Sequence, residues 1–301
     1  MDVLITGTTV GGIGFETAKA LLQAGHRVFV ICRDAAKTKD TIESLAPFGK
    51  VVKAADSLAL EDLDSVRKFV ETFKQDSLNC LINNAGVMAI PELRKTKQGL
   101  ENHVGINYVS HYLLTRLLLP RLIEGAKRSG QPSRIINVSS DAHFWAQDVD
   151  VNKAFEGVNP YDAQQQYALS KLFQIWDTAD INARYASGSS SPSVLSFSLH
   201  PGVVSTNLTR EVPQESLKAF KENPSMVFLT PAQGAATTIK CATASLKELG
   251  AIPPLKTLDE QVLYYRDSNK ATKYSKLVKA NGKNTEVLRA TEGFLKQRSY
   301  L

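Results

Sequence analysis

Residues 3–14 have the sequence VLITGTTVGGIG, and this stretch decides the fold. Its first residues, Val3, Leu4 and Ile5, form a short run that is apolar throughout, which is typical of a strand buried on both faces of a sheet. The glycine-rich part that follows favours a tight turn, and residues 12–23 carry apolar side chains at helical spacing. The stretch therefore predicts the first strand, turn and helix of a βαβ unit.

The same alternation continues along the chain. Apolar runs predict further strands at residues 28–32, 51–52, 80–82, 134–138 and 194–199, and amphipathic runs predict helices at 34–45, 60–73, 99–123 and 163–185. After these, a helix is expected from Thr230 to Ala244, a seventh strand at 262–265, and one or two helices within 273–298. Apolar strands separated by helices indicate a parallel sheet covered on both faces. We expect an α/β fold with a single doubly wound, Rossmann-type domain over residues 1–301, about seven strands and helices on both faces.

Charge and cysteine content narrow the classes of function. Lys and Arg number 36 against 30 Asp and Glu, a net charge of +6, and the basic residues are not gathered in one block. This dispersed excess argues against nucleic-acid binding and suits an anionic ligand. Because Cys32, Cys80 and Cys241 are far apart, a disulfide framework or a metal site is not expected, and a reducing compartment is.

The sequence predicts no membrane span. The chain enters its first apolar run at Val3 with no basic region before it. The apolar stretch 112–122 is interrupted by Arg116, Pro120 and Arg121, and it is too short and too charged to cross a bilayer. A cytoplasmic location is the expectation that follows.

The glycine-rich turn predicts a phosphate site. Glycines let the backbone come close to a pyrophosphate, and the N-terminus of the next helix offers free N–H groups and a positive dipole. A plain turn without a ligand is the simpler alternative. The residues expected to contact a dinucleotide here are Gly7, Thr9, Gly12, Ile13 and Gly14.

The end of the second predicted strand indicates which dinucleotide binds. An acidic residue at this place would hydrogen-bond the ribose 2′-hydroxyl of NAD. Cys32 and Arg33 stand there instead, and an arginine can hold the 2′-phosphate of NADP through a forked, charge-assisted contact. A solvated arginine at a strand end is the alternative. NADP(H) is therefore the expected cofactor.

The loop after the fourth strand has the sequence NNAG, residues 83–86. Its amides can satisfy backbone groups, and its small residues leave room for a ribose, so we expect Asn84, Ala85 and Gly86 at the cofactor. A simple turn would use the same residue types. After the sixth strand, HPGVVST at 200–206 offers backbone groups and a hydroxyl to a carboxamide. Taken singly, His200 fits a structural role better than a catalytic one.

Tyr167 and Lys171 lie four residues apart on one face of a predicted helix. A phenol, with an ordinary pKa of about 10, is a poor base at neutral pH. A neighbouring ammonium favours the phenolate, so we expect Lys171 to lower the pKa of Tyr167 and to let it exchange a proton with a carbonyl oxygen as hydride arrives. A Tyr and a Lys four residues apart often occur by chance, so this prediction depends on the companion residues.

The companions are a serine pair and an asparagine. Ser139 and Ser140 follow the fifth strand, where a hydroxyl can hydrogen-bond a substrate oxygen. Asn107 lies inside the helix expected at 99–123, where asparagine is unfavourable, which indicates a special role such as holding water near Lys171.

In this order, the motifs TG…GIG, NNAG, a helical Asn, Ser, YxxxK and PGxxxT resemble the short-chain dehydrogenase/reductase family over about residues 2–250. The segments FETAKALL, ICRD and HPGVVSTNL are similar to its retinol dehydrogenase and WW-domain oxidoreductase branch. The resemblance implies that Tyr167 is the acid/base and that Lys171 lowers its pKa and binds the ribose. It also implies that Ser140, by its position in the pattern, is the catalytic serine of the pair, and that Asn107 supports a proton relay. At the cofactor it implies contacts from Pro201, Gly202, Val203 and Thr206, the last two at the nicotinamide end.

Three departures from the family pattern stand out. Gly11 and Gly12 are adjacent, so the phosphate contacts differ in detail. An ungapped alignment puts the family's adenine-contacting Asp at Ala59, and the nearby Asp56 is the candidate to replace it. The spacer 141–166 between Ser140 and Tyr167 is long for the family. We expect its aromatic residues Phe144, Trp145, Phe155 and Tyr161 to form part of the pocket rim and to block the usual helix-to-helix dimer, while monomer and homodimer both stay open.

The expected function is NADP(H)-dependent oxidoreduction of a carbonyl or alcohol on a small or medium apolar metabolite, running as a reductase. A segment at about 207–229 is expected to close over the substrate with its apolar residues Leu208, Phe220, Met226, Val227 and Phe228. Two alternatives stay open: a cofactor-binding regulatory protein without turnover, and a lyase or epimerase on the same fold.

Overall fold

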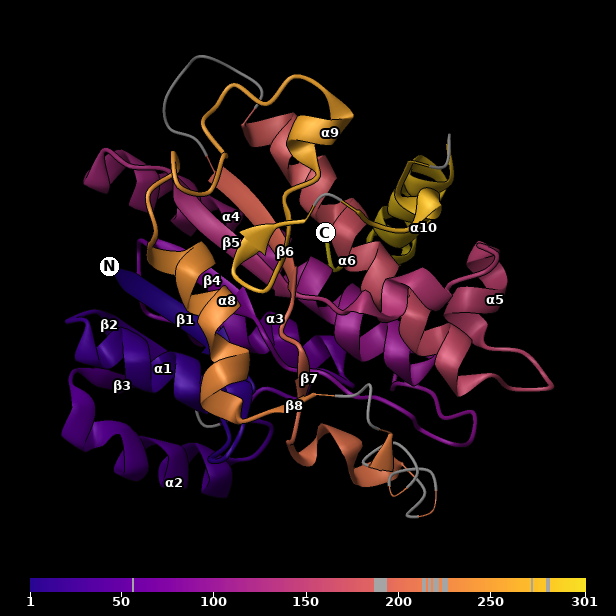
Figure 1. Cartoon of the computed structure of the whole chain (residues 1–301), viewed down its shortest axis with the longest axis horizontal. Coiled ribbons are helices and arrows are strands. Elements are labelled where there is room, and N and C mark those ends of the chain that lie inside the picture. The colour runs from indigo at the N-terminus through magenta and orange to yellow at the C-terminus, as the bar shows by residue number, and fades with distance from the viewer. Residues whose placement is uncertain are drawn as a thin grey trace.

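A computed structural model describes residues 1–55, 57–186, 194–212, 215, 218, 222–223, 227–271, 273–279 and 282–301. An eight-stranded sheet runs through its centre in the order β10-β9-β6-β5-β4-β1-β2-β3 (Figure 1). The strands are β1 Asp2–Thr6, β2 Arg27–Ile31, β3 Val51–Lys53, β4 Cys80–Asn83, β5 Ser133–Val138, β6 Val194–His200, β9 Tyr264–Arg266 and β10 Asn269–Lys270. All neighbouring pairs from β9 to β3 are parallel, so the predicted doubly wound α/β fold is confirmed.

The eighth strand, β10, was not predicted. It pairs antiparallel with β9 across a turn at Asp267 and Ser268, both of which have positive φ. Two consecutive residues in the left-handed region are the mark of a two-residue hairpin turn of type I′. A strand of two exposed residues, Asn269 and Lys270, leaves no apolar pattern to read.

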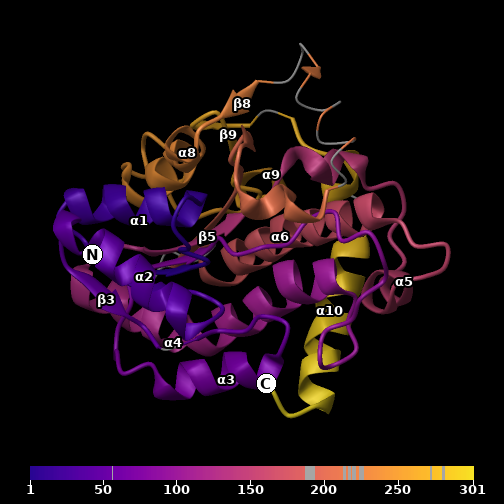
Figure 2. The same ribbon diagram turned by 90° about the horizontal axis from the view of Figure 1, so that it is seen from below.

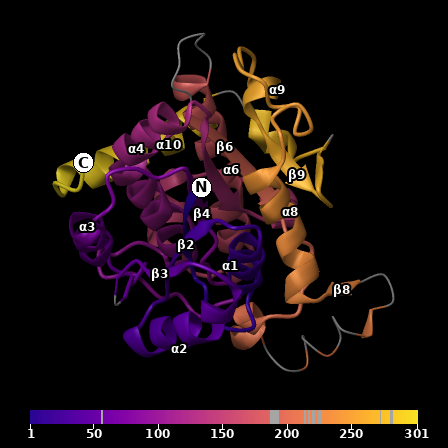
Figure 3. The ribbon, with the colours of Figure 1, turned by 90° about the vertical axis from the view of Figure 1, so that its left-hand side faces the viewer.

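Helices cover both faces of the sheet (Figure 3). On one face lie α1 Ile13–Gln23, α2 Ala35–Leu45 and α8 Pro231–Thr243; on the other lie α3 Leu63–Thr72, α4 Ser110–Ser129 and α6 Ala163–Tyr185. Strand β1 shows why its run is apolar throughout: Val3 and Ile5 pack in the cluster under α1 and α8, while Leu4 packs in the cluster under α3, α4 and α6. Within the described ranges, no helix is both long enough and apolar enough to cross a membrane.

The helix expected over 99–123 begins later and in a different form. Residues His103–Val109 form a π-helix that continues directly into α4. The residues before it are held in an irregular turn, in which the Thr96 hydroxyl accepts a hydrogen bond from the Leu100 N–H. The Glu101 carboxylate then accepts the N–H of Val104 in the first turn. Short π-helical segments are rare in proteins, and those that occur are often found at functional sites.

Helix α10, Lys283–Gln297, packs against α6 and the short α5, Val151–Glu156 (Figure 2). The rings of Phe155 and Phe294 meet edge to face with centroids 6.2 Å apart. Phe155 is therefore a core residue under α10, and its predicted place on the pocket rim is wrong. The sequence pattern did not predict this contact, because Phe294 lies far from Phe155 in the sequence.

Two helical glycines offer a matched test of the packing. A Cβ added at Gly125 in α4 would meet the backbone carbonyl of Leu78, whereas one added at Gly293 in α10 would meet nothing within 4 Å among the described atoms. We expect Gly125→Ala to lower the free energy of unfolding by about 1–3 kcal/mol through overpacking. The control Gly293→Ala should raise it by up to about 1 kcal/mol through helix propensity. Urea denaturation of both variants measures the two values, and equal shifts would contradict this packing.

Candidate active site

The candidate residues gather where the parallel strands end. The order of strands reverses around β1 and β4, and ligands in such folds bind beyond the carboxyl ends of the strands at this switch point. The segments that leave this edge are the glycine turn after β1, Arg33 after β2, Asn84 after β4, Ser140 after β5 and Pro201 after β6. The sheet thus brings together motifs that are far apart in the sequence.

The glycine turn is built against the loop after β4. Gly7 has a φ of 70°, and a Cβ there would lie 2.8 Å from Ala85 Cα. At Gly14, a Cβ would meet the Asn84 side-chain amide, which donates 2.9 Å hydrogen bonds to the carbonyls of Thr6 and Gly7. The N-cap residue of α1 is Gly12, which supplies no side-chain cap. The first N–H groups of this helix are therefore left to face an anionic ligand.

The hydroxyl of Thr6 connects strand β1 to the loop after β4 and to His111, and these contacts were not predicted from the sequence. It accepts hydrogen bonds from the N–H groups of Asn84 and Ala85, both at 3.1 Å, and it donates to His111 Nε2 at 3.0 Å. The Nδ1–H of His111 in turn donates to the carbonyl of Asn107. Burial lowers the pKa of His111 to about 4, so the ring is neutral and can donate from one nitrogen while accepting at the other. The signal available was the spacing of Asn107 and His111, four residues apart on one helix.

Asn107 lies in the π-helix and ties two elements together. Its Oδ1 accepts from the Val87 N–H at 2.8 Å, and its Nδ2 donates to the Val87 carbonyl and to Ser170 Oγ, both at 3.0 Å. The side chain thus joins the loop after β4 to α6. A Cβ on Gly86 would lie 3.2 Å from Asn107 Oδ1 and 3.8 Å from Lys171 Nζ, which makes these groups close neighbours.

The two serines after β5 have different surroundings. The Ser139 hydroxyl is buried and donates to the carbonyl of Lys171 at 2.7 Å. Ser140 is partly exposed; its Oγ accepts from the Ala142 N–H and hydrogen-bonds the Tyr167 side chain. Of the two serines, Ser140 is therefore the one at the phenol.

Tyr167 and Lys171 are both buried in α6. The Lys171 ammonium nitrogen lies 5.6 Å from the centre of the Tyr167 ring and donates to the Val138 carbonyl at 2.8 Å. Burial raises the pKa of Tyr167 to about 12, against the smaller lowering effect of the Ser140 hydrogen bond. Burial also lowers the pKa of Lys171 to about 7. The expectation that Lys171 lowers the pKa of Tyr167 is therefore wrong for the chain alone, because desolvation disfavours both charged forms.

The segment after β6 packs beside the glycine turn. Strand β7, Val203–Val204, pairs with β8, Phe228–Leu229, and a Cβ on Gly234 of α8 would meet both Val204 and Ile13. Gly202 has a φ of 87°, and the Thr206 hydroxyl accepts from the Leu208 N–H. These contacts place Pro201, Gly202, Val203 and Thr206 along one side of the site.

The remaining predicted residues lie at the second strand and in the loops. Arg33 is exposed just after β2, and Thr9 Oγ1 donates to the buried Cys32 Sγ at 3.7 Å. Asp56, Phe220 and Met226 lie outside the described residues. The described residues contain no group of three or more His, Cys, Asp or Glu side chains that could hold a metal ion.

Asp141 anchors the loop that carries Ser140. Its carboxylate accepts a hydrogen bond from the Tyr264 hydroxyl at 2.8 Å and forms an ion pair with Arg266 at 2.8 Å. Its N–H donates to His200 Nδ1 at 3.2 Å. His200 thus contacts the backbone of this loop, and strand β9 supplies two of the anchors, Tyr264 and Arg266.

The pKa of Lys171 predicts how stability depends on pH. An unfolded lysine titrates at about 10.4, so below pH 7 the folded chain must bury an ammonium, and this cost fades as pH rises toward 10. Lys171→Met removes the free-energy cost of burying the ammonium. It also removes the hydrogen bond to the Val138 carbonyl, and we expect that effect to be the same at every pH. We expect the melting temperature of this variant, relative to the unmodified chain, to be highest at pH 6 and to fall toward pH 10. The exposed Lys127→Met is the control, and a difference that is flat for both variants would contradict the burial argument.

Comparison with known proteins agrees with this geometry. A family model described as short chain dehydrogenase matches residues 2–217. Short-chain dehydrogenase/reductase prx1 of Penicillium roqueforti is 38% identical over 243 residues, which cover 79% of this chain and 68% of that protein. Retinol dehydrogenase 11 of Homo sapiens is 39% identical over 243 residues, which cover 80% of this chain and 72% of that protein.

Solved structures are similar as well. An uncharacterized protein from Mycobacterium paratuberculosis matches with a TM-score of 0.73 at 26% identity, covering 98% of this chain and 93% of that chain. The Pseudomonas aeruginosa RhlG/NADP active-site complex matches with a TM-score of 0.60 at 25% identity, covering 81% of this chain and 89% of that chain. The matched motifs, their place on the sheet and these relatives show that the chain belongs to the short-chain dehydrogenase/reductase family, in its retinol dehydrogenase branch.

Proposed function

We propose that this chain is an NADPH-dependent carbonyl reductase, with Tyr167 as its proton donor. The observation that carries the proposal is the meeting of Tyr167, Ser140 and Lys171 at the carboxyl edge of the sheet, beside the Asn107 amide. Two of these groups come from α6, one from the end of β5 and one from the π-helix. They can hold a carbonyl oxygen between two hydroxyls.

The residues at the glycine turn fit a dinucleotide. The uncapped N-terminus of α1 and the close approach of Gly7 and Gly14 to the loop after β4 leave backbone N–H groups for a pyrophosphate. Arg33 is exposed at the end of β2, where it can pair with a 2′-phosphate. When bound, the nicotinamide supplies the hydride. Solved structures that are similar include both an NADP complex and an NADH complex, so the choice of NADPH rests on Arg33.

The phenol is suited to the role of proton donor in a reduction. With its pKa raised to about 12, the Tyr167 hydroxyl stays protonated at neutral pH, and a protonated group is what a forming alkoxide needs. Ser140 donates a second hydrogen bond to the same oxygen and stabilises its negative charge. Tyr167 then gives its proton to the oxygen, which completes the reduction to an alcohol.

The substrate is an apolar carbonyl compound. Phe144 and Trp145 lie in the same short helical segment that begins after Ser140, and they are 44% and 49% exposed, so two large apolar rings near the site are open to a ligand. Exposed aromatic residues beside a polar site are typical of a binding surface for an apolar molecule. The relatives named retinol dehydrogenase agree with this class.

Cofactor choice is tested by binding. NADPH and NADH are titrated against the unmodified chain and Arg33→Ala, following nicotinamide fluorescence. Loss of a charge-assisted hydrogen bond should weaken NADPH binding by roughly ten- to a hundredfold and leave NADH binding within about twofold. Arg128→Ala, an exposed arginine on α4, is the control and should change neither. Equal losses for the two nucleotides would contradict the role of Arg33, and binding of neither would overturn the proposed oxidoreductase function.

Turnover is tested with a panel of apolar aldehydes and ketones and with Tyr167→Phe. This variant keeps the ring and removes only the hydroxyl, so we expect kcat to fall by roughly 10²–10⁴-fold while NADPH affinity stays within about threefold. Mass spectrometry of the product distinguishes the alternatives, because a reduction adds two hydrogens and a lyase or epimerase reaction does not. Unchanged kcat in Tyr167→Phe would overturn the proposed role.

A further inference from the structure

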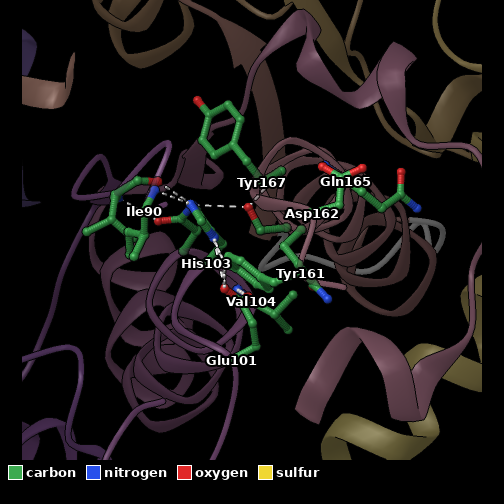
Figure 4. Close-up of polar contacts among 12 residues, drawn as sticks. Ile90, Glu101, His103, Val104, Tyr161, Asp162, Gln165 and Tyr167 are labelled. Atoms are coloured by element: carbon green, nitrogen blue, oxygen red, sulfur yellow. Dashed lines mark hydrogen bonds and ion pairs between the residues drawn. The ribbon is translucent and has the colours of Figure 1, made fainter. Parts of the chain in front are cut away.

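A buried polar cluster lies directly behind Tyr167 (Figure 4). Glu101 and His103 have no exposed surface, and Tyr161 is partly buried. Glu101 Oε1 accepts hydrogen bonds from His103 Nδ1 at 2.8 Å and from the Tyr161 hydroxyl at 2.7 Å, and Oε2 accepts from the Val104 N–H at 2.9 Å. Three donors therefore converge on one carboxylate, which is an uncommon arrangement in a protein core and calls for an explanation.

The carboxylate fixes which nitrogen of His103 carries its proton. With Nδ1–H pointing to Glu101, the other ring nitrogen, Nε2, is an acceptor, and it faces the N–H of Ile90 at 3.4 Å. The opposite tautomer would set two N–H groups against each other. A carboxylate that orients a histidine in this way is a common means of fixing its tautomer.

His103 and Asn107 hold one loop at two points. They lie four residues apart in the same π-helix; Asn107 holds both backbone groups of Val87, and His103 holds the N–H of Ile90. Between these points, Ala89 has a φ of 55°, a region that residues other than glycine rarely adopt. This loop follows Gly86, the last of the NNAG residues, where an added Cβ would lie 3.8 Å from Lys171 Nζ.

His103 also touches the phenol. Its ring meets the ring of Tyr167 edge to face, with centroids 6.0 Å apart and planes at 68°. In this geometry the imidazole limits the positions that the buried Tyr167 ring can take. Tyr161, from the long spacer before α6, completes the cluster by its hydrogen bond to Glu101.

We propose that His103, oriented by Glu101 and Tyr161, is a positioning residue that fixes both the ring of Tyr167 and the 87–90 loop for hydride transfer. The proposal rests on the reductase function proposed above. It also assigns a role to Tyr161, one of the aromatic residues of the long spacer before α6. Misplacement of a reacting group by about 1 Å can reduce a rate by up to about a hundredfold, so loss of the contact between His103 and Tyr167 can slow turnover measurably.

The test uses a matched pair of tyrosines. Tyr161→Phe removes a hydroxyl that donates to Glu101 at 2.7 Å, and the control Tyr300→Phe removes one that donates to Asp64 at 2.8 Å, away from the site. We expect kcat to fall by roughly three- to tenfold in Tyr161→Phe, with the KM for NADPH within about twofold, and to stay unchanged in Tyr300→Phe. If kcat falls alike in both variants, in proportion to their loss of melting temperature, the positioning role is overturned.

A second variant tests the histidine itself. His103→Asn keeps a donor toward Glu101 but lacks both the ring and the acceptor for Ile90. We expect its kcat to fall by roughly ten- to a hundredfold, and amide hydrogen exchange in a peptide spanning 87–90 to become at least about tenfold faster. Exchange in this peptide should not change in Tyr300→Phe.

Hydrogen exchange separates this proposal from the proposed function. If the unmodified chain binds NADPH but reduces no carbonyl, the reductase function fails. In that case, faster exchange at 87–90 in His103→Asn alone still supports the hold of His103 on the loop. Unchanged exchange in that variant overturns it, whether or not the chain has turnover.

Discussion

The hydrogen bonds of the Asn107 amide are the constraint on which the candidate site depends. Through them, the loop after β4 is joined to α6, and through the neighbouring carbonyl and His111 the connection reaches Thr6 and the glycine turn. Asn107, His111 and Thr6 are all buried, so a lost partner would leave another polar atom unsatisfied in a medium of low dielectric constant. The strand ends therefore hold a fixed arrangement before any ligand binds.

Burial sets the proton chemistry of the same site. In water the phenol of tyrosine and the ammonium of lysine have similar pKa values, about 10 and about 10.4. Inside this fold, desolvation moves the pKa of Tyr167 up to about 12 and that of Lys171 down to about 7, so near pH 7 the phenol is neutral and the lysine is about half protonated. A site prepared in this way suits a proton donor. The Lys171 contact with the Val138 carbonyl keeps that lysine in place without a carboxylate partner.

The sequence was sufficient for what depends on local pattern. Apolar runs and helical spacing predicted the parallel sheet and most helices, with α6 at its correct bounds. Motifs at strand ends were sufficient to bring Tyr167, Ser140 and Asn107 to one edge. Contacts between distant segments were not predictable: the π-helix at His103–Val109, the packing of Phe155 under α10, and the junction at Thr6. The sign of the pKa shift at Tyr167 was also missed, because sequence shows which charges are near but not how deeply they are buried.

The late position of β9 and α10 in the chain has a consequence for synthesis on the ribosome. Strand β6 has β9 as a neighbour in the sheet, and α6 receives α10 and the carbonyl of Val278, which accepts a hydrogen bond from Trp176. Until those segments emerge, the nascent chain presents an open edge at β6 and an uncovered apolar face on α6. The helix that carries Tyr167 therefore becomes fully enclosed only after β9, Val278 and α10 have joined the fold.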